Sequence, residues 1–181
     1  DVHSLIMQLR MVKDQTEIEN IRKASECAQI GLEAAVKSIR AGVTETAIAG
    51  EGQLAARRKG AGSVLVYVNA GRPRVHAHPR NKEVKIGDTV MVDVMPSFRG
   101  YYSDLAHTVL VDSATNEKKK AYQAFLEASE AYIEALRSDM PLDELERIVQ
   151  NLFKEHGVDK YYVYGFAHGV GLRFEEEPIT T

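Results

Sequence analysis

Residues 90–104 read VMVDVMPSFRGYYSD, and this stretch decides the fold class of the chain. The apolar, β-branched run around Asp93 predicts a buried strand, and the tyrosine-containing run that ends at Asp104 predicts a second strand. The proline, serine, arginine and glycine between the two runs are turn residues. A hairpin that turns through Ser97–Gly100 places Asp93 directly opposite Asp104, on the same face of the sheet.

Two carboxylates that face each other on half-buried strands repel each other and are costly to desolvate. Either a cation lies between them, or one of them carries a raised pKa. We interpret the pair as metal ligands. The alternative is that Asp104 is a solvated turn residue and that Asp93 is a lone buried acid.

Three histidines are candidates for the same site. His168 lies in the segment GFAHGVGL, where a predicted strand runs into a glycine-rich bend that can present a side chain to a cleft. His76 lies in a basic loop shortly before the Asp93 strand, and His78 competes with it for the same role. Taken singly, His168 is better explained as a buried structural histidine, and His76 and His78 as histidines of a surface loop.

Amphipathic helices flank the hairpin, and their pattern occurs twice. The predicted order is long helix, short helix, strand, and the second copy lies 97 residues after the first, so that Gly60 falls on Gly157. Duplication and coincidence both remain open. The predicted elements are helices over 17–41, 44–59, 117–137 and 141–156, and strands over 63–68, 89–94, 101–111 and 161–166.

A duplicated unit of this kind predicts an α+β fold with helices on one side of a joined sheet. By the same displacement, a second hairpin is expected beyond Thr181, so we expect the C-terminal strands to be missing from these 181 residues. Residues 1–13 are predicted to be a linker from an upstream N-terminal domain, and residues 14–181 an incomplete catalytic domain.

Composition excludes several classes of protein. The 181 residues carry a net charge of −3, and with 44% hydrophobic and 27% charged residues they are typical of a globular chain. The absence of a strongly basic half argues against nucleic-acid binding, and no apolar run reaches the length of a transmembrane helix. A single cysteine, Cys27, fits a reducing compartment, and we expect a cytoplasmic protein.

As a set, these motifs resemble the catalytic domain of the creatinase/methionine aminopeptidase ("pita-bread") superfamily. The resemblance is greatest to the Xaa-Pro dipeptidase (prolidase) and Xaa-Pro aminopeptidase branch of the M24 metallopeptidases, and it covers essentially the whole chain. It rests on GDTVMVD at 87–93, GYYSD at 100–104 and AHGVGL at 167–172, together with a histidine seventeen residues before Asp93.

The resemblance implies a dinuclear metal hydrolase on a pita-bread fold, with pseudo-duplicated halves around a curved antiparallel sheet. Asp93 would chelate one ion, Asp104 would bridge both ions, and His168 would bind the other. His76 would be catalytic, through a hydrogen bond to the substrate or the tetrahedral intermediate. Two further glutamates, expected beyond Thr181, would complete the site. Two Mn²⁺ or Co²⁺ ions suit this ligand set, and Zn²⁺ or Fe²⁺ are compatible with it.

The sequence departs from the family pattern at Glu175, which lies where the family keeps a second histidine and is here assigned a catalytic role. A carboxylate cannot donate a proton as an imidazolium does, so the preference for proline is in question. Met95 replaces a usual glycine, and His107 lies in place of an arginine. The triplet Glu175–Glu177 reads by itself as a solvated loop.

The predicted function is a metal-dependent exopeptidase that removes the N-terminal residue of short peptides, with Xaa-Pro as the expected substrate. One alternative is a non-peptidase C–N hydrolase or lyase of the creatinase type on the same fold. The other is a catalytically inactive pita-bread binding module. A short peptide substrate and a homodimer are the expected partners, with no nucleic acid and no membrane.

Overall fold

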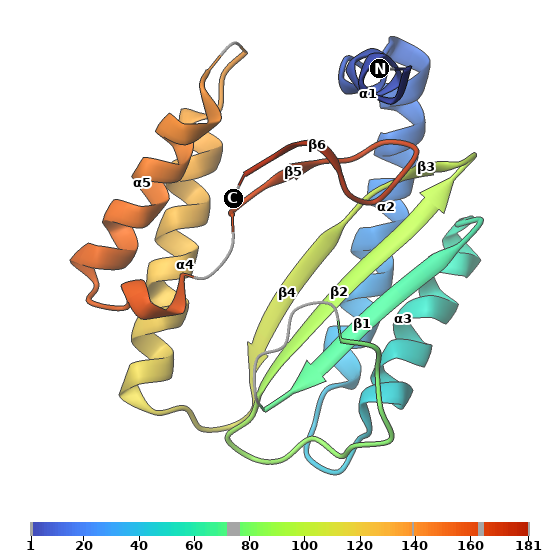
Figure 1. The fold of residues 1–181 in the computed structure, drawn as a ribbon. Coiled ribbons are helices and arrows are strands. Elements are labelled where there is room, and N and C mark those ends of the chain that lie inside the picture. Colours follow the sequence, from blue (N-terminus) through green and yellow to red (C-terminus); the bar gives the residue numbers. More distant parts are fainter. Residues whose placement is uncertain (1, 72–76, 139, 163–164, 181) are drawn as a thin grey trace. The chain divides into compact units, whose positions relative to one another are not determined.

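The computed structural model describes residues 2–71, 77–138, 140–162 and 165–180 (Figure 1). It divides into two compact units, which we describe separately. The first comprises Asp1–Ser113 with Gly169–Glu177, and the second comprises Ala114–His168 with Pro178–Thr181. The first unit contains both aspartates of the hairpin.

Three helices belong to the first unit: α1 (Val2–Met11), α2 (Gln15–Ser38) and α3 (Glu45–Lys59). Helix α2 begins two residues before the predicted start, because Asp14 and Glu17 form a reciprocal capping box with each other's backbone N–H groups. The N-terminal residues before α2, which were predicted to be a linker, form a helix over Val2–Met11. Their assignment as a linker from another domain stays a prediction.

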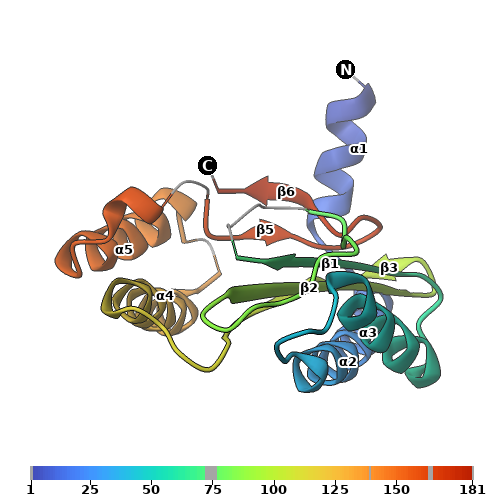
Figure 2. The ribbon, with the colours of Figure 1, turned by 90° about the horizontal axis from the view of Figure 1, so that it is seen from below.

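The sheet of this unit is antiparallel and consists of β1 (Val64–Ala70), β2 (Thr89–Phe98), β3 (Tyr101–Tyr102) and β4 (Leu105–Leu110). Strand β2 pairs with each of the other three. Helices α2 and α3 cover one face of the sheet, as Figure 2 shows. The core of this unit lies between the two helices on one side and the sheet on the other. It is built from alternate strand residues and from apolar helix residues, among them Val66, Val68, Val92, Val94, Ala35, Ile48 and Ala56.

The hairpin register differs from the prediction by two residues. The chain turns through Arg99 and Gly100 alone, with φ angles of 49° and 87°, and Ser97 pairs with Tyr102. Both turn residues are left-handed, as the tight two-residue hairpin turn requires. The predicted pairing of Asp93 with Asp104 was therefore wrong, and Asp93 lies opposite Ala106. A shift of two residues preserves the face on which a side chain lies, because strand side chains alternate with a period of two.

Helices α2 and α3 approach each other at two buried glycines. A Cβ atom at Gly31 would lie 3.0 Å from the Gly52 carbonyl oxygen and 3.1 Å from both Ala56 Cβ and Val94 Cγ1. A Cβ atom at Gly52 would lie 3.2 Å from Ala35 Cβ. The two glycines thus allow the helices to pack closely on each other and on β2.

The second unit is built on the helix pair α4 (Asn116–Ala135) and α5 (Leu142–Glu155), followed by the 3-10 turn η1 (Asp159–Tyr161). The strand predicted over 161–166 is not found in the described part of that range, and residues 163–164 lie outside it. Instead, the Glu146 carboxylate accepts hydrogen bonds from the Phe166 N–H (2.8 Å) and the Tyr162 hydroxyl. The bond to Glu146 occupies the Phe166 N–H, which a strand ladder would otherwise use. Two short strands complete the chain, β5 (His168–Gly169) and β6 (Glu176–Ile179).

The local geometry of the two helix pairs supports the duplication. With a displacement of 97 residues, the end of α2 falls on the end of α4, and the start of α3 falls on the start of α5. The C-caps Ile39 and Leu136 both have ψ of 119°, and Gly60 and Gly157 both have positive φ. These shared boundaries follow from the sequence match. Superposition of the two halves stays a prediction.

We expect Gly31→Ala to destabilise the first unit by about 1–3 kcal/mol, because the new methyl group would overlap backbone and core atoms that cannot move independently. Gly50→Ala is the matched control. Gly50 is exposed in α3 with no atom within 4 Å of its Cβ position, so alanine there should stabilise the helix by up to about 1 kcal/mol. Urea unfolding followed by far-UV circular dichroism measures both. Equal effects of the two substitutions would contradict the close packing.

Candidate active site

The face of the sheet that α2 and α3 leave uncovered carries polar residues. Tyr67 of β1 pairs with Asp93 of β2, and Asn69 pairs with Met91. Tyr67, Asn69 and Asp93 are buried, with 8%, 3% and 9% of their surface exposed. Buried polar side chains in the middle of a sheet are unfavourable unless they are satisfied. Their presence on one face marks this region as a functional site.

Asp104 lies in the two-residue break between β3 and β4, and its carboxyl group reaches Asp93. The two carboxyl groups are hydrogen bonded to each other. Burial, the charge of Asp93 and this hydrogen bond raise the pKa of Asp104 to about 8, and the negative charge of Glu175 adds to the effect. The two aspartates are therefore close to each other, as predicted, although the hairpin register differs from the prediction. Asp104 can reach Asp93 because it lies in the break between β3 and β4 and not within a strand.

Glu175 belongs to a loop that is tied to the hairpin. The Tyr102 N–H donates to the Gly171 carbonyl oxygen (2.6 Å), and the ring of Tyr102 packs edge-on against that of Phe174, with their centroids 6.2 Å apart. These contacts hold the loop beside Asp104, which is why the charge of Glu175 affects that carboxyl group.

The neighbouring Glu176 is buried, so the interpretation of the whole triplet as a solvated loop was wrong. Only 6% of its surface is exposed. Its carboxylate is bound by the guanidinium of Arg10, by the Arg173 N–H (2.9 Å) and by the Lys13 ammonium at 3.6 Å. Burial opposes ionisation, but these groups outweigh it and hold the pKa of Glu176 below its ordinary value. Three adjacent glutamates gave no indication of which one would point inward.

The candidate histidines are placed differently from one another. His76 lies outside the described residues. His78 packs edge-on against Tyr67, with ring centroids 5.0 Å apart and an interplanar angle of 85°. Since Tyr67 is the cross-strand partner of Asp93, His78 lies on the side of the sheet that carries the aspartates. His168 is exposed and falls in the second unit, so its part in the site stays a prediction.

The donor set of the first unit fits a divalent cation. The buried Asp93 and the partly buried Asp104 contact each other and raise the cost of a second negative charge, which a cation would offset, and oxygen ligands of this kind suit hard divalent ions. In residues 2–71, 77–138, 140–162 and 165–180, no three His, Cys, Asp or Glu side chains converge to form a complete metal site. Asp93 and Asp104 could therefore supply two of the ligands, and further donors are needed.

A mixed fold of helices on an antiparallel sheet, with a buried pair of aspartates on the open face, is that of a pita-bread metallopeptidase. Residues 19–181 match metallopeptidase family M24, and the chain belongs to that family. This confirms the fold class and the resemblance inferred from the three motifs.

Similar proteins are Xaa-Pro dipeptidases and related enzymes. The Xaa-Pro dipeptidase of Pyrococcus furiosus is 30% identical over 181 residues, which are 98% of this chain and 52% of that protein. The solved structure of prolidase from the same organism superposes with a TM-score of 0.93 and covers 98% of this chain. An X-Pro aminopeptidase structure from Thermotoga maritima gives 0.89 at 28% identity over 97% of this chain. The chain spans about half the length of these relatives.

Among the helices of the described residues, none combines the length and the apolar character needed to cross a membrane.

We expect the metal-free chain to lose stability as the pH rises from about 4 to about 8. The pKa of Asp104 is raised from 3.8 to about 8 by folding, so between these values the folded chain holds a proton that the unfolded chain has released. Asp104→Asn should remove this dependence and stabilise the metal-free chain at pH 8 by about 1–3 kcal/mol. Asp112→Asn, at an exposed left-handed position that asparagine tolerates, is the control. Parallel stability profiles for the two variants would contradict the assignment.

Proposed function

We propose that this chain forms part of a metal-dependent exopeptidase that releases the N-terminal residue of short peptides, with Xaa-Pro as the preferred sequence. The observation that carries the proposal is the buried contact between Asp93 and Asp104 in a chain of family M24. The similarity to Xaa-Pro dipeptidases and an X-Pro aminopeptidase supports the choice of substrate. The chain's own pair of acids favours an enzyme over a binding module, since a binding surface has no need of two mutually repelling buried carboxyls.

In the proposed site, Asp93 and Asp104 would hold metal, His168 is the histidine ligand that the family resemblance assigns, and two ions, Mn²⁺ or Co²⁺, would complete it. When bound, these ions would lower the pKa of a water molecule and polarise the scissile carbonyl. The role assigned to His76 is to donate a hydrogen bond to the oxygen that becomes negatively charged during the reaction. Tyr67, the cross-strand partner of Asp93, packs against His78 on the aspartate side of the sheet. A homodimer and a cytoplasmic location remain part of this proposal.

Glu175 is assigned a catalytic role beside Asp104, where it acts as a hydrogen-bond acceptor. An ionised carboxylate accepts hydrogen bonds and cannot donate one, so it suits a protonated amine or an N–H of the substrate better than a carbonyl oxygen. We therefore propose a weaker discrimination in favour of Xaa-Pro than a histidine at this position would give.

Divalent metal binding should depend on both aspartates. We expect Asp93→Asn and Asp104→Asn each to weaken Mn²⁺ binding at least about tenfold, because each removes an anionic ligand. The same variants should abolish the rise in melting temperature that Mn²⁺ produces. Since Asp104→Asn is expected to stabilise the metal-free chain, its loss of metal binding would not result from unfolding. Mn²⁺ titration calorimetry with Asp112→Asn as the control measures this, and unchanged binding by both variants would refute the metal site.

Hydrolysis of Met-Pro, Leu-Pro and a dipeptide without proline by the enzyme of which this chain forms part, each with Mn²⁺ or Co²⁺, tests the activity. We expect cleavage that a chelator abolishes, with a modest preference for the proline substrates. Glu175→His should raise kcat/KM for Xaa-Pro by about tenfold or more, because the imidazole restores a proton donor. Chelator-resistant hydrolysis would exclude the proposed chemistry, and a Glu175→His variant no better on Xaa-Pro would exclude the role given to Glu175.

A further inference from the structure

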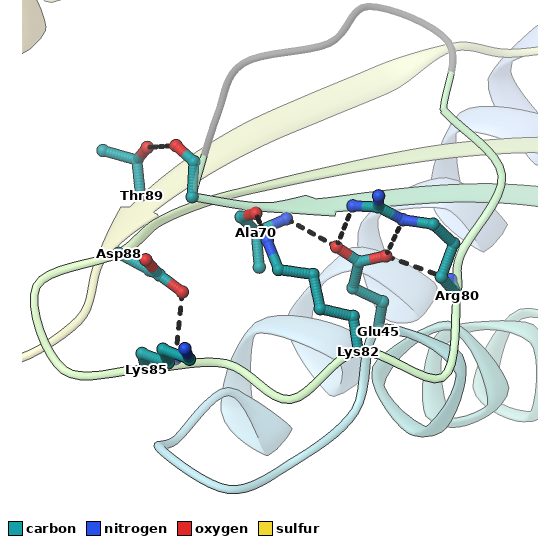
Figure 3. Close-up of polar contacts among 8 residues, drawn as sticks. Glu45, Ala70, Arg80, Lys82, Lys85, Asp88 and Thr89 are labelled. Atoms are coloured by element: carbon teal, nitrogen blue, oxygen red, sulfur yellow. Dashed lines mark hydrogen bonds and ion pairs between the residues drawn. The ribbon is translucent and has the colours of Figure 1, made fainter.

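The first unit contains a fully buried carboxylate that does not belong to the aspartate pair. Glu45 is the first residue of α3, and 0% of its surface is exposed. It receives four hydrogen bonds, each of 3.0 Å (Figure 3). The Ala70 N–H and Arg80 Nη2 donate to Oε1, and the Arg80 N–H and Nε donate to Oε2.

These bonds do not serve the helix to which Glu45 belongs. The start of α3 is already capped by Thr44, whose hydroxyl accepts from the Ala47 N–H at 3.2 Å. The Glu45 carboxylate instead bonds two residues that are distant in sequence, Ala70 and Arg80. A buried acid that only started a helix would need neither partner.

Ala70 and Arg80 are the two ends of one segment. Ala70 is the last residue of β1, and further bonds fix each end. The Lys82 ammonium donates to the Ala70 carbonyl oxygen, the Gly71 N–H donates to the Thr89 carbonyl oxygen (2.9 Å), and the Thr46 N–H donates to the Arg80 carbonyl oxygen (3.2 Å). Figure 3 shows both ends converging on the Glu45 carboxylate.

The charge of Glu45 is held in place by its donors. Burial alone would raise the pKa of this carboxyl group, but the Arg80 guanidinium and the two backbone N–H groups outweigh burial and keep it below its ordinary value. The planar guanidinium matches the carboxylate with two parallel hydrogen bonds, which fixes direction as well as distance. Arg80 itself is about half exposed, so its charge costs little to desolvate.

The segment between these ends carries His76 and His78. Of these, the described His78 packs on Tyr67, the cross-strand partner of Asp93. We propose that Glu45 is a positioning residue, whose carboxylate joins Ala70, at the end of β1, to Arg80 and so fixes the nearby His78 relative to Asp93. The catalytic part of this inference rests on the function proposed above. The positional part does not depend on it.

Amide hydrogen exchange tests the positional part. In Glu45→Gln, one oxygen becomes an NH₂ group that faces donors, so we expect the Ala70 and Arg80 amides to exchange at least about tenfold faster. The Val68 amide, inside β1, should change much less. The chemical shift of the His78 ring, identified by the loss of its resonance in His78→Gln, should change as well, because the ring is expected to leave its position beside Tyr67. Glu51→Gln, an exposed acid on the same helix, is the control and should change none of these.

Arg80→Lys provides a second variant if Glu45→Gln fails to fold. It keeps the positive charge and removes the two-pronged contact, so it should accelerate exchange at Ala70 and Arg80 to a smaller extent. Equal acceleration at Val68, with the His78 resonance unmoved, would show that Glu45 only stabilises the fold and would overturn the proposal.

Kinetics then separate the two proposals. If Xaa-Pro is hydrolysed, Glu45→Gln should lower kcat by about tenfold or more with KM nearly unchanged, while the chain still binds Mn²⁺. If no peptide is hydrolysed, the proposed function fails, and the exchange and resonance data still decide the positional role of Glu45. A kcat unaffected by a variant that does loosen the segment would refute the catalytic part alone.

Discussion

The left-handed turn at Arg99 and Gly100 is the constraint on which the first unit depends. It sets the register of β2 against β3 and β4, and β2 also pairs with β1. Strand alternation then places valines against α2 and α3 and sends Tyr67 and Asp93 to the opposite face. The break after β3 lets Asp104 reach Asp93, so the turn and the break together create the acidic pair.

Carboxyl groups removed from solvent in the first unit are accommodated by different physical means. Glu45 is ionised and held by the fork of Arg80 and two backbone N–H groups. Glu176 is held by Arg10, Lys13 and the Arg173 N–H. For Asp104, partial burial and the contact with Asp93 raise the pKa to about 8 instead of lowering it. Basic side chains and backbone N–H groups thus stabilise the charges of Glu45 and Glu176, whereas the surroundings of Asp104 oppose its ionisation.

Family membership and the local geometry are consistent with each other, and each adds something separate. The family match covers residues 19–181, which include the motifs on which the resemblance rests. The structure adds the supporting contacts: Tyr102 with the loop that carries Glu175, and Glu45 with the segment that carries the histidines. An active site of this kind needs rigid support, because small displacements of catalytic groups reduce the rate strongly.

The sequence by itself determined the fold class, the helix pairs and the proximity of the two aspartates, though not their strand pairing, because hydrophobic periodicity and turn residues are local signals. It placed the end of the first helix pair at Gly60 and that of the second at Gly157, where the structure has them. Only the tertiary structure decided the hairpin register, because Arg99 adopts a left-handed conformation that its residue type does not announce. It also selected Glu176 from three adjacent glutamates and revealed the role of Glu45. Apart from the Arg173 N–H beside Glu176, the partners cited for these two acids lie 25 to 166 residues away in the sequence, and no local pattern encodes such contacts.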